Sequence, residues 1–223
     1  GRYAPLKATR PYLVIGLTGC LAQQEGARLL KIAPALDLVM SPDHIASLPE
    51  LVARAEEGQR TVKVGFSEMD QHRFLQAAPG PRDEGRTGAM VTIQKGCDNH
   101  CSYCIVPSVR GPEVSRPAGE ILSEVRDLTA AGIREVTLIG QNVNSYQGGE
   151  GVGFVQLLEQ VDALPDLRRI RFTTSHPKDF TPGLARCFGS LQKLCPWLHL
   201  PVQSGSSRVL ELMKRKYSRE HYL

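Results

Sequence analysis

The sequence predicts an α/β protein in which β-strands alternate with α-helices. Two observations support this fold class. Short runs rich in aliphatic and β-branched residues, such as residues 11–19 and 135–142, read as strands. Between such runs lie segments with helical apolar spacing, as in residues 153–164, where apolar side chains recur at i, i+3, i+4 and i+7. This alternation is typical of parallel sheets, in which functional side chains gather at the carboxyl ends of the strands.

The first part of the chain predicts one such parallel unit. Residues 11–19 are expected to form a buried strand, residues 21–34 a helix and residues 36–41 a second strand. A second helix follows, for which Ser47 and Glu50 have the spacing of a capping box. A short strand is expected at residues 62–66.

A composition change then separates two domains. Residues 76–88 are rich in Gly, Pro and charge, which indicates an exposed linker. We therefore expect a partial amino-terminal domain at residues 1–75 and a second domain at residues 89–223.

The second domain repeats the strand–helix pattern four times. Right-handed crossovers between such units curl a sheet into part of a (β/α) barrel. The expected strands are residues 90–96, 135–142, 168–175 and 197–203, and the expected helices are residues 119–132, 153–164, 181–194 and 206–216. Polar residues at the strand ends become site candidates: Gln141, Asn142, Thr174, Ser175, His176, Gln203 and Ser204.

Composition limits the functional classes. The 223 residues are 41% hydrophobic and 22% charged, and no apolar run approaches the length of a membrane span. Six cysteines without a signal peptide favour metal ligation in a reducing cytoplasm over disulfides. The net charge of +4 permits a nucleic-acid partner without requiring one. The chain starts at Gly1 and stops at Leu223 after a helical segment, so we expect an internal fragment.

The most informative feature is a cysteine triplet. Cys97, Cys101 and Cys104 follow the strand at residues 90–96 with C-x3-C-x2-C spacing. Three thiolates on one loop leave a coordination position open, whereas four close a metal site. A structural zinc site with His100 as fourth ligand, or inert thiols, are the alternatives.

Four blocks carry a family resemblance. In order, they are GCDNHCSYCIVPSVRGPEVSRP at residues 96–117, LIGQNVNSY at 138–146, IRFTTSHP at 170–177 and LHLPVQSGS at 198–206. Together they resemble the methylthiotransferase branch of the radical S-adenosylmethionine enzymes, most closely the MiaB-type tRNA methylthiotransferases. The resemblance implies a six-unit partial barrel, of which about four units are expected here.

The resemblance also implies cofactors. A [4Fe–4S] cluster would be held by Cys97, Cys101 and Cys104, and its fourth iron would bind S-adenosylmethionine. Gln141 and Asn142 stand where the superfamily has a Gly-Gly-Glu-type motif, which helps to hold the methionine amino group. Ser175 and Gln203 are expected to line the nucleoside pocket, with capping of strand ends as the alternative role.

Cys20 matches a second motif. TGCLAQ at residues 18–23 is similar to the third cysteine motif of the family's amino-terminal domain, which binds an auxiliary [4Fe–4S] cluster. Because no other cysteine precedes Cys97, we expect Cys20 to be a free thiol here, or simply a small buried side chain. One cluster is therefore supportable in this chain.

The implied activity is methylthiolation of carbon 2 of an isopentenylated adenine beside the tRNA anticodon. The implied partners are the tRNA anticodon loop and an electron donor such as a flavodoxin or ferredoxin, with no membrane. We do not expect this chain alone to be fully active. A ribosomal-protein aspartate methylthiotransferase and a non-catalytic zinc or RNA-binding module are the alternatives.

The remaining reactive or charged residues have simpler interpretations. Cys187 and Cys195 are expected to be core thiols, and His199 a hydrogen-bonded histidine within a strand. The arginines at 168–171 and the run at 214–216 are expected to be solvated surface more often than a nucleic-acid contact.

Overall fold

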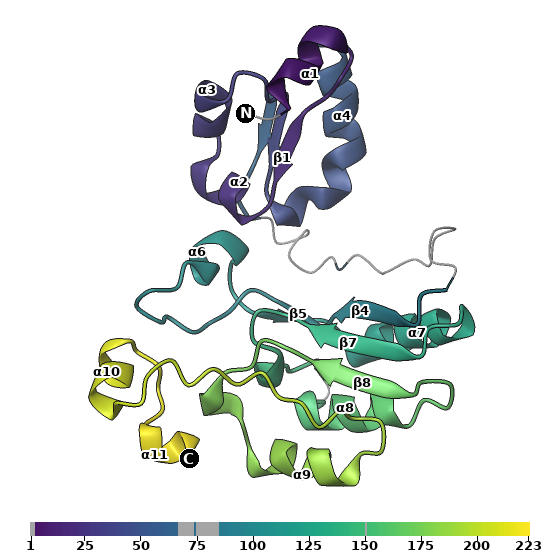
Figure 1. Cartoon of the computed structure of the whole chain (residues 1–223), viewed down its shortest axis with the longest axis vertical. Helices are drawn as coiled ribbons and strands as arrows, with labels where there is room; N and C mark the ends of the chain where they lie inside the picture. Colours follow the sequence, from purple (N-terminus) through teal and green to yellow (C-terminus); the bar gives the residue numbers. More distant parts are fainter. Residues whose placement is uncertain (1–2, 67–73, 75–84, 150) are drawn as a thin grey trace. The chain divides into compact units, whose positions relative to one another are not determined.

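The computed structural model describes residues 3–66, 74, 85–149 and 151–223. The chain divides into two compact units, Gly1–Arg73 with Ser108–Gly111, and Phe74–Pro107 with Pro112–Leu223. Each unit contains a parallel sheet with helices (Figure 1). The α/β prediction is confirmed. Most of the expected linker at residues 76–88 lies outside the described residues.

The first unit is a small three-layer structure. Its elements are α1 (Ala4–Thr9), β1 (Gly16–Thr18), α2 (Cys20–Glu25), α3 (Arg28–Ile32), β2 (Leu38–Met40), the 3-10 helix η1 (Pro42–Ser47), α4 (Leu48–Glu56) and β3 (Thr61–Lys63). The three strands are parallel in the order β1-β2-β3. Successive side chains of the buried central strand point to opposite faces. Leu38 and Met40 pack with Leu51 of α4, and Val39 packs with Leu29 of α3.

Three expectations for this unit were wrong in detail. The strand expected at residues 11–19 shortens to β1, which is a partly exposed edge strand because only β2 pairs with it among the described strands. The helix expected at residues 21–34 breaks at Gly26, which has a positive φ of 50°. Ser47 makes no capping hydrogen bond, because its backbone is already helical and its hydroxyl accepts from Lys63 Nζ at 2.7 Å.

The second unit follows the predicted alternation for three strand–helix repeats. Its elements are β4 (Gly88–Thr92), β5 (Gln94–Lys95), β6 (Val114–Ser115), α7 (Ala118–Ala130), β7 (Glu135–Ile139), η2 (Val143–Ser145), α8 (Phe154–Asp162), β8 (Arg169–Phe172), η3 (Pro177–Asp179), α9 (Pro182–Ser190), α10 (Ser207–Leu212) and α11 (Arg219–Tyr222). The short helix α6 (Val106–Arg110) belongs to both units, because its residues from Ser108 onward group with the first. Strands β4, β7 and β8 form a parallel sheet in that order, and β5 pairs with β6 in an antiparallel ladder. Helices α7, α8 and α9 confirm three of the expected helices.

The core lies on the face of the sheet that these helices cover (Figure 1). The register places Val91, Leu138 and Phe172 side by side on that face, and all three are fully buried. On the opposite face, Met90 and Arg171 flank Thr137 and remain partly or largely exposed. The sheet is therefore covered on one face only within the described residues, although parallel sheets are usually buried on both.

The fourth expected repeat is only partly formed. Residues 197–203 are not a strand, because pairing with β8 stops at one parallel bridge between Ile170 and Leu194. Pro196 and Pro201 lack the N–H group that a strand ladder needs, which explains the early end. Cys195 lies just before this segment, beyond the end of α9, and donates its backbone N–H to the carbonyl of Ile170. The helix expected at residues 206–216 shortens to α10.

Candidate functional site

One pocket in the second unit brings the candidate residues together. It has a volume of about 240 Å³ and lies where β4, β7 and β8 end. All the strand-end candidates except Ser204 line it, as do the three cysteines: Cys97, Cys101, Cys104, Gln141, Asn142, Thr174, Ser175, His176 and Gln203. Asn99, Tyr103, Val106, Pro201 and Arg215 complete the lining.

The cysteine loop holds two buried thiols and one exposed thiol. Cys97 and Cys101 are buried, and Cys104 is exposed. The backbone N–H and the side-chain amide of Asn99 both donate to Cys97 Sγ, at 3.4 and 3.5 Å. Burial raises the pKa of the Cys97 thiol, and these two hydrogen bonds oppose that effect. The described residues contain no group of three His, Cys, Asp or Glu side chains arranged for one metal ion. A cubane cluster binds each thiolate through a different iron, so its ligands stand further apart than those of a single ion.

Gln94 joins two walls of the pocket. This fully buried residue accepts hydrogen bonds at Oε1 from the backbone N–H groups of Gln141 and Asn142, at 2.8 and 3.1 Å. Its Nε2 donates to the carbonyl of Gly96 at 2.7 Å, and the N–H of Gly96 donates in turn to Gln141 Oε1 at 2.7 Å. The base of the cysteine loop is thereby fastened to the segment after β7. Sequence reasoning missed Gln94, whose only signal was a polar residue closing an apolar strand.

Arg215 forms another wall of the pocket. It is 6% exposed, and its Nη1 donates to Cys101 Sγ at 3.2 Å. The backbone N–H of Ser102 donates to the carbonyl of Met213 at 3.1 Å, which holds the cysteine loop against the end of α10. The expectation that the run at 214–216 is solvated surface is wrong for Arg215.

Three buried polar atoms of the pocket residues have no hydrogen-bond partner among the described residues. They are Asn142 Oδ1, Ser175 Oγ and His176 Nε2. Buried polar groups are normally paired, so such atoms at a cavity indicate a place for a ligand. Thr174 and Gln203 line the same cavity with positive φ values of 70° and 68°, which are uncommon for residues other than glycine.

Local contacts fix the orientation of two of these groups. The Asn142 side-chain amide donates to Asp179 Oδ2 at 2.8 Å, which leaves Oδ1 as an acceptor. His176 Nδ1 accepts from the backbone N–H of Lys178 at 3.2 Å, so the proton of the neutral ring is on Nε2. Burial, reinforced by the positive charge of Arg215, lowers the pKa of His176 to about 4.

The other candidates lie elsewhere. Cys20 is the first residue of α2 in the first unit, half-buried, and does not line the pocket. Cys187 is buried in the main core, as predicted, and burial raises the pKa of its thiol. Cys195 is only half-buried, and His199 lies outside any strand, so the predictions for these two residues were wrong in part.

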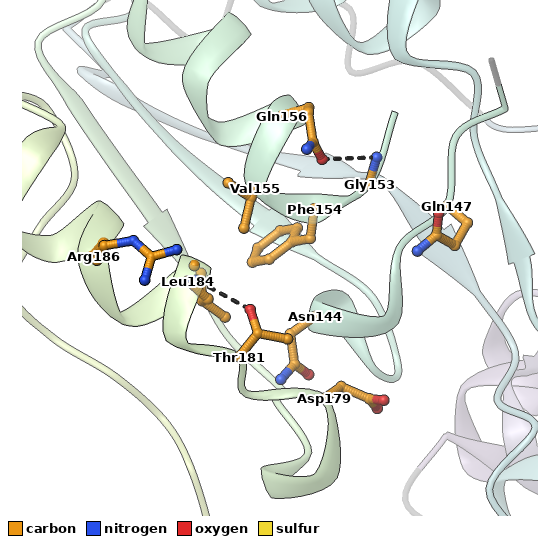
Figure 2. Close-up of a pocket in the computed structure, with 11 residues that line it drawn as sticks. Asn144, Gln147, Gly153, Phe154, Val155, Gln156, Asp179, Thr181, Leu184 and Arg186 are labelled. Atoms are coloured by element: carbon orange, nitrogen blue, oxygen red, sulfur yellow. Dashed lines mark hydrogen bonds between the residues drawn. The ribbon is translucent and has the colours of Figure 1, made fainter. Parts of the chain in front are cut away.

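A second pocket of about 360 Å³ lies at the amino-terminal ends of α8 and α9. Figure 2 shows that two of its polar side chains are hydrogen-bonded to backbone N–H groups. Gln156 Oε1 accepts from the N–H of Gly153 at 3.2 Å, and Thr181 Oγ1 accepts from the N–H of Leu184 at 3.2 Å. These contacts cap the two helices, so they give this pocket a structural explanation.

Comparison with known proteins identifies the family. The model of the Radical SAM superfamily matches residues 91–223, and the chain therefore belongs to this superfamily. The matched region contains the cysteine loop and every other residue that lines the cysteine pocket. Members of the superfamily use a [4Fe–4S] cluster and S-adenosylmethionine.

Curated relatives are similar over the whole chain. It is 49% identical to a tRNA-2-methylthio-N(6)-dimethylallyladenosine synthase of Geotalea uraniireducens, over 100% of this chain and 50% of the relative. Proteins of the same name from Citrifermentans bemidjiense and Myxococcus xanthus are 50% and 49% identical, again over 100% of this chain and 51% and 48% of their own lengths. The chain thus spans about half the length of the curated relatives it matches.

Solved structures share the fold at low identity. The cobalamin-dependent S-adenosylmethionine radical enzyme OxsB matches 99% of this chain and 35% of its own with a TM-score of 0.66 and 12% identity. The radical S-adenosylmethionine methyltransferase TsrM of Kitasatospora setae matches 93% of this chain and 46% of its own, with a TM-score of 0.57 and 16% identity.

The residues of the pocket fit the superfamily's cofactors. Three thiols line one cavity, and the sulfur atoms of Cys97 and Cys101 receive N–H donors, as cluster ligands commonly do. Asn142 Oδ1 and His176 Nε2 offer an unused acceptor and donor beside them.

Proposed function

We propose that this chain carries the cluster-binding and S-adenosylmethionine-binding part of an enzyme that methylthiolates carbon 2 of an isopentenylated adenine next to the tRNA anticodon. The observation that carries the proposal is the cysteine pocket, which is lined by three thiols and by three residues with a polar atom that no described residue pairs. The names and 49–50% identity of the relatives support a tRNA base as the substrate.

Each part of the pocket has a role in this proposal. Cys97, Cys101 and Cys104 hold the cluster. Asn142 Oδ1 is an acceptor for the amino group of S-adenosylmethionine, since its amide nitrogen is already bound to Asp179. Gln141, Ser175 and Gln203 surround the remainder of that ligand. When bound, the cluster and S-adenosylmethionine supply the one-electron chemistry that removes a hydrogen atom from the adenine ring.

The protein supplies position and protection from water. Gln94 hydrogen-bonds both to the start of the cysteine loop and to the segment after β7. These bonds hold the two ligand-binding walls of the pocket at a fixed separation. The Nε2–H of the neutral His176 donates to a polar group of the bound ligand. An adenine in an anticodon loop is unstacked enough to enter such a pocket. The electron donor in this proposal is a flavodoxin or ferredoxin of the cytoplasm.

The proposal includes a domain arrangement. Residues 89–223 form part of a six-unit (β/α) barrel, contributing three complete units and a partial fourth, residues 76–88 are the linker and residues 1–75 belong to an amino-terminal methylthiotransferase domain. The uncovered face of the β4-β7-β8 sheet supports the barrel, because the inner face of an incomplete barrel is the face without helices. Cys20 is an auxiliary-cluster ligand in this arrangement, with its partner ligands outside the chain.

The first test is cluster content. Anaerobic reconstitution of this chain with iron and sulfide should give a brown protein with about four irons per chain. Cys101→Ala should remove most of this iron, whereas Cys187→Ala, which replaces a core thiol outside the pocket, should retain it. A colourless zinc protein, or equal iron content in both variants, contradicts the proposal.

The second test is the substrate. Mass spectrometry of digested tRNA should find no methylthioadenosine in cells lacking the gene, and its return with the wild-type gene but not with the Cys101→Ala gene. An unchanged methylthioadenosine content in the deletion strain contradicts the tRNA assignment and leaves the aspartate methylthiotransferase to be tested.

A further inference from the structure

A second hollow of the second unit carries unpaired positive charge. It has a volume of about 590 Å³ and lies at the end of α10, between Arg208, Glu211, Lys214, Lys216 and Tyr217. We call it the basic groove. Three of these five side chains are cations and one is a carboxylate, so the groove is positively charged. Neither the family match nor the names of the relatives assign it a role.

The cations of the groove are available to a ligand. Arg208, Lys214 and Lys216 are exposed, and their side chains form no ion pair or hydrogen bond with another residue in the described part of the chain. Elsewhere in the unit, Arg169 and Arg171 share the carboxylate of Glu135, at 2.9 Å each. The groove therefore carries a net positive charge whose three cations form no ion pair within the described residues.

The backbone of the groove is held in an unfavourable conformation. Lys214 and Lys216 have positive φ values of 55° and 58°. Lys214 follows the cap of α10, where glycine is the usual residue because a side chain in this conformation costs about 1 kcal/mol. Such strain persists where the arrangement that it produces is used. Here it places two lysines at the surface on either side of the buried Arg215.

The groove adjoins the cysteine pocket through this segment. Arg215 lines the pocket and donates to Cys101, while its two neighbours line the groove. Tyr217 also lines the groove, and its hydroxyl donates to the carbonyl of Val202 at 2.7 Å, next to the pocket residue Gln203. A ligand with a flat ring in the pocket and anionic groups joined to that ring matches this arrangement.

We infer that the basic groove binds phosphate groups of the RNA strand whose target base enters the cysteine pocket. This inference rests on the proposed function and names the RNA contact of that site. Single-stranded RNA presents splayed bases joined by a phosphate backbone, and lysine and arginine side chains are the usual partners of these phosphates. Lys214 and Lys216 bind the backbone without reading the sequence, so they position the base.

The test measures RNA affinity against salt. The reconstituted chain is titrated with a fluorescent RNA hairpin of the anticodon arm, and its binding is followed by anisotropy at several salt concentrations. The double variant Lys214→Gly/Lys216→Gly removes two charges, and glycine is more compatible with both backbone conformations, so its fold should be retained. We expect affinity to fall about tenfold, and the slope of log K against log salt to become shallower by roughly 1.4, at about 0.7 per single-strand phosphate contact.

Two matched variants separate position from net charge. Lys214→Arg/Lys216→Arg keeps both charges and should bind the hairpin within about twofold of the wild type. Arg126→Ala/Arg168→Ala removes two exposed cations elsewhere on the same unit and should also leave affinity and slope unchanged. Wild-type binding by the glycine variant, or an equal loss in the Arg126/Arg168 variant, overturns the inference.

A competition experiment tests the class of partner. Poly-glutamate should displace the hairpin far less effectively than unlabelled RNA, and equal displacement would mean a general polyanion surface and overturn the RNA assignment. The iron content of the glycine variant should equal that of the wild type. If the full-length protein does not modify tRNA, the proposed function fails whatever the hairpin affinity. If it modifies tRNA and the glycine variant still binds normally, only the groove inference fails.

Discussion

Arg215 Nη1 donates a hydrogen bond to the sulfur of Cys101 at 3.2 Å, although the two residues are 114 positions apart in the sequence. Donors to cluster sulfur raise the reduction potential, because they stabilise the more negative reduced state. Arg215→Ala should therefore lower the potential of the reconstituted cluster by tens of millivolts. An anaerobic redox titration followed by electron paramagnetic resonance measures this shift.

Two further variants control this experiment. Arg219→Ala removes an exposed arginine that pairs only loosely with Glu220, at 3.9 Å, and should leave the potential unchanged. Arg215→Lys keeps the charge and should recover part of the shift. A potential that is the same in wild type and Arg215→Ala, at equal iron content, would exclude this role.

Gly140, which directly precedes the pocket residue Gln141, has no room for a side chain. A Cβ atom there would lie 2.5 Å from Gln94 Oε1 and 3.0 Å from the Gln94 carbonyl oxygen. Gly140→Ala should displace the Gln94 amide from its two backbone donors and cost about 1–3 kcal/mol of unfolding free energy. Urea denaturation measures the loss. Gly119→Ala, in α7 with open space around it, should be neutral or slightly stabilising, and equal losses in both variants would contradict this account.

The buried ion pair between Arg116 and Glu124 predicts a larger stability effect. Arg116 is 0% exposed and donates to the carboxylate of Glu124, which is 2% exposed. Glu124→Leu should cost about 3–5 kcal/mol, since it removes the main counter-charge from a buried guanidinium. Chemical denaturation compares this variant with Arg169→Ala, which breaks an exposed pair and should cost less than about 1 kcal/mol. Similar losses would mean that burial does not decide the effect.

His176 predicts an acid-sensitive contribution to stability. Its pKa is lowered to about 4 by burial and by the positive charges of Arg215, Lys178 and Lys216, which outweigh the opposing carboxylate of Asp179. A lowered histidine pKa favours the neutral ring in the folded state. The contribution of neutral His176 to the free energy of unfolding is therefore complete above about pH 6.5, and it is lost as the pH falls from there towards 4.

The size of this effect follows from the shift. A difference of about 2.5 pKa units corresponds to about 3 kcal/mol at full protonation. Unfolding free energies between pH 7 and pH 4 should fall by about this much more in the wild type than in His176→Gln, which cannot titrate. Parallel pH profiles for the two proteins, or an NMR titration that places His176 near 6.5, would contradict the prediction.

The repeating part of the fold could be predicted because one periodicity dominates each element. Leu157, Leu158 and Val161 mark the buried stripe of α8, and Val136 and Leu138 alternate along β7. The cysteine spacing and the polar strand ends likewise located most of the pocket, because parallel strands end at one edge of a sheet. These signals are local and need no knowledge of tertiary contacts.

The missed features depend on distant contacts. Arg215 sits in a run of charges that is typical of surface, and its burial follows from the left-handed backbone on either side of it. Gln94 gains its role only when the strand end of β7 lies beside it. Apolar residues in the segment at residues 197–203 alternate as they do in a strand. Pro196 and Pro201 nevertheless lack the backbone N–H donors of a strand ladder, which a hydrophobic pattern does not reveal.

The side-chain amide of Gln94 links the two segments of backbone that carry the cysteines and the polar residues after β7. It bonds to the backbone on both sides of the cavity, so the cysteine loop and the residues after β7 move as one piece. Pro201, Gln203 and Arg215 line the same cavity but form no hydrogen bond with Gln94 in the described part of the chain. Substitutions at these three residues should therefore change the lining of the pocket while the bond between the cysteine loop and the segment after β7 stays intact.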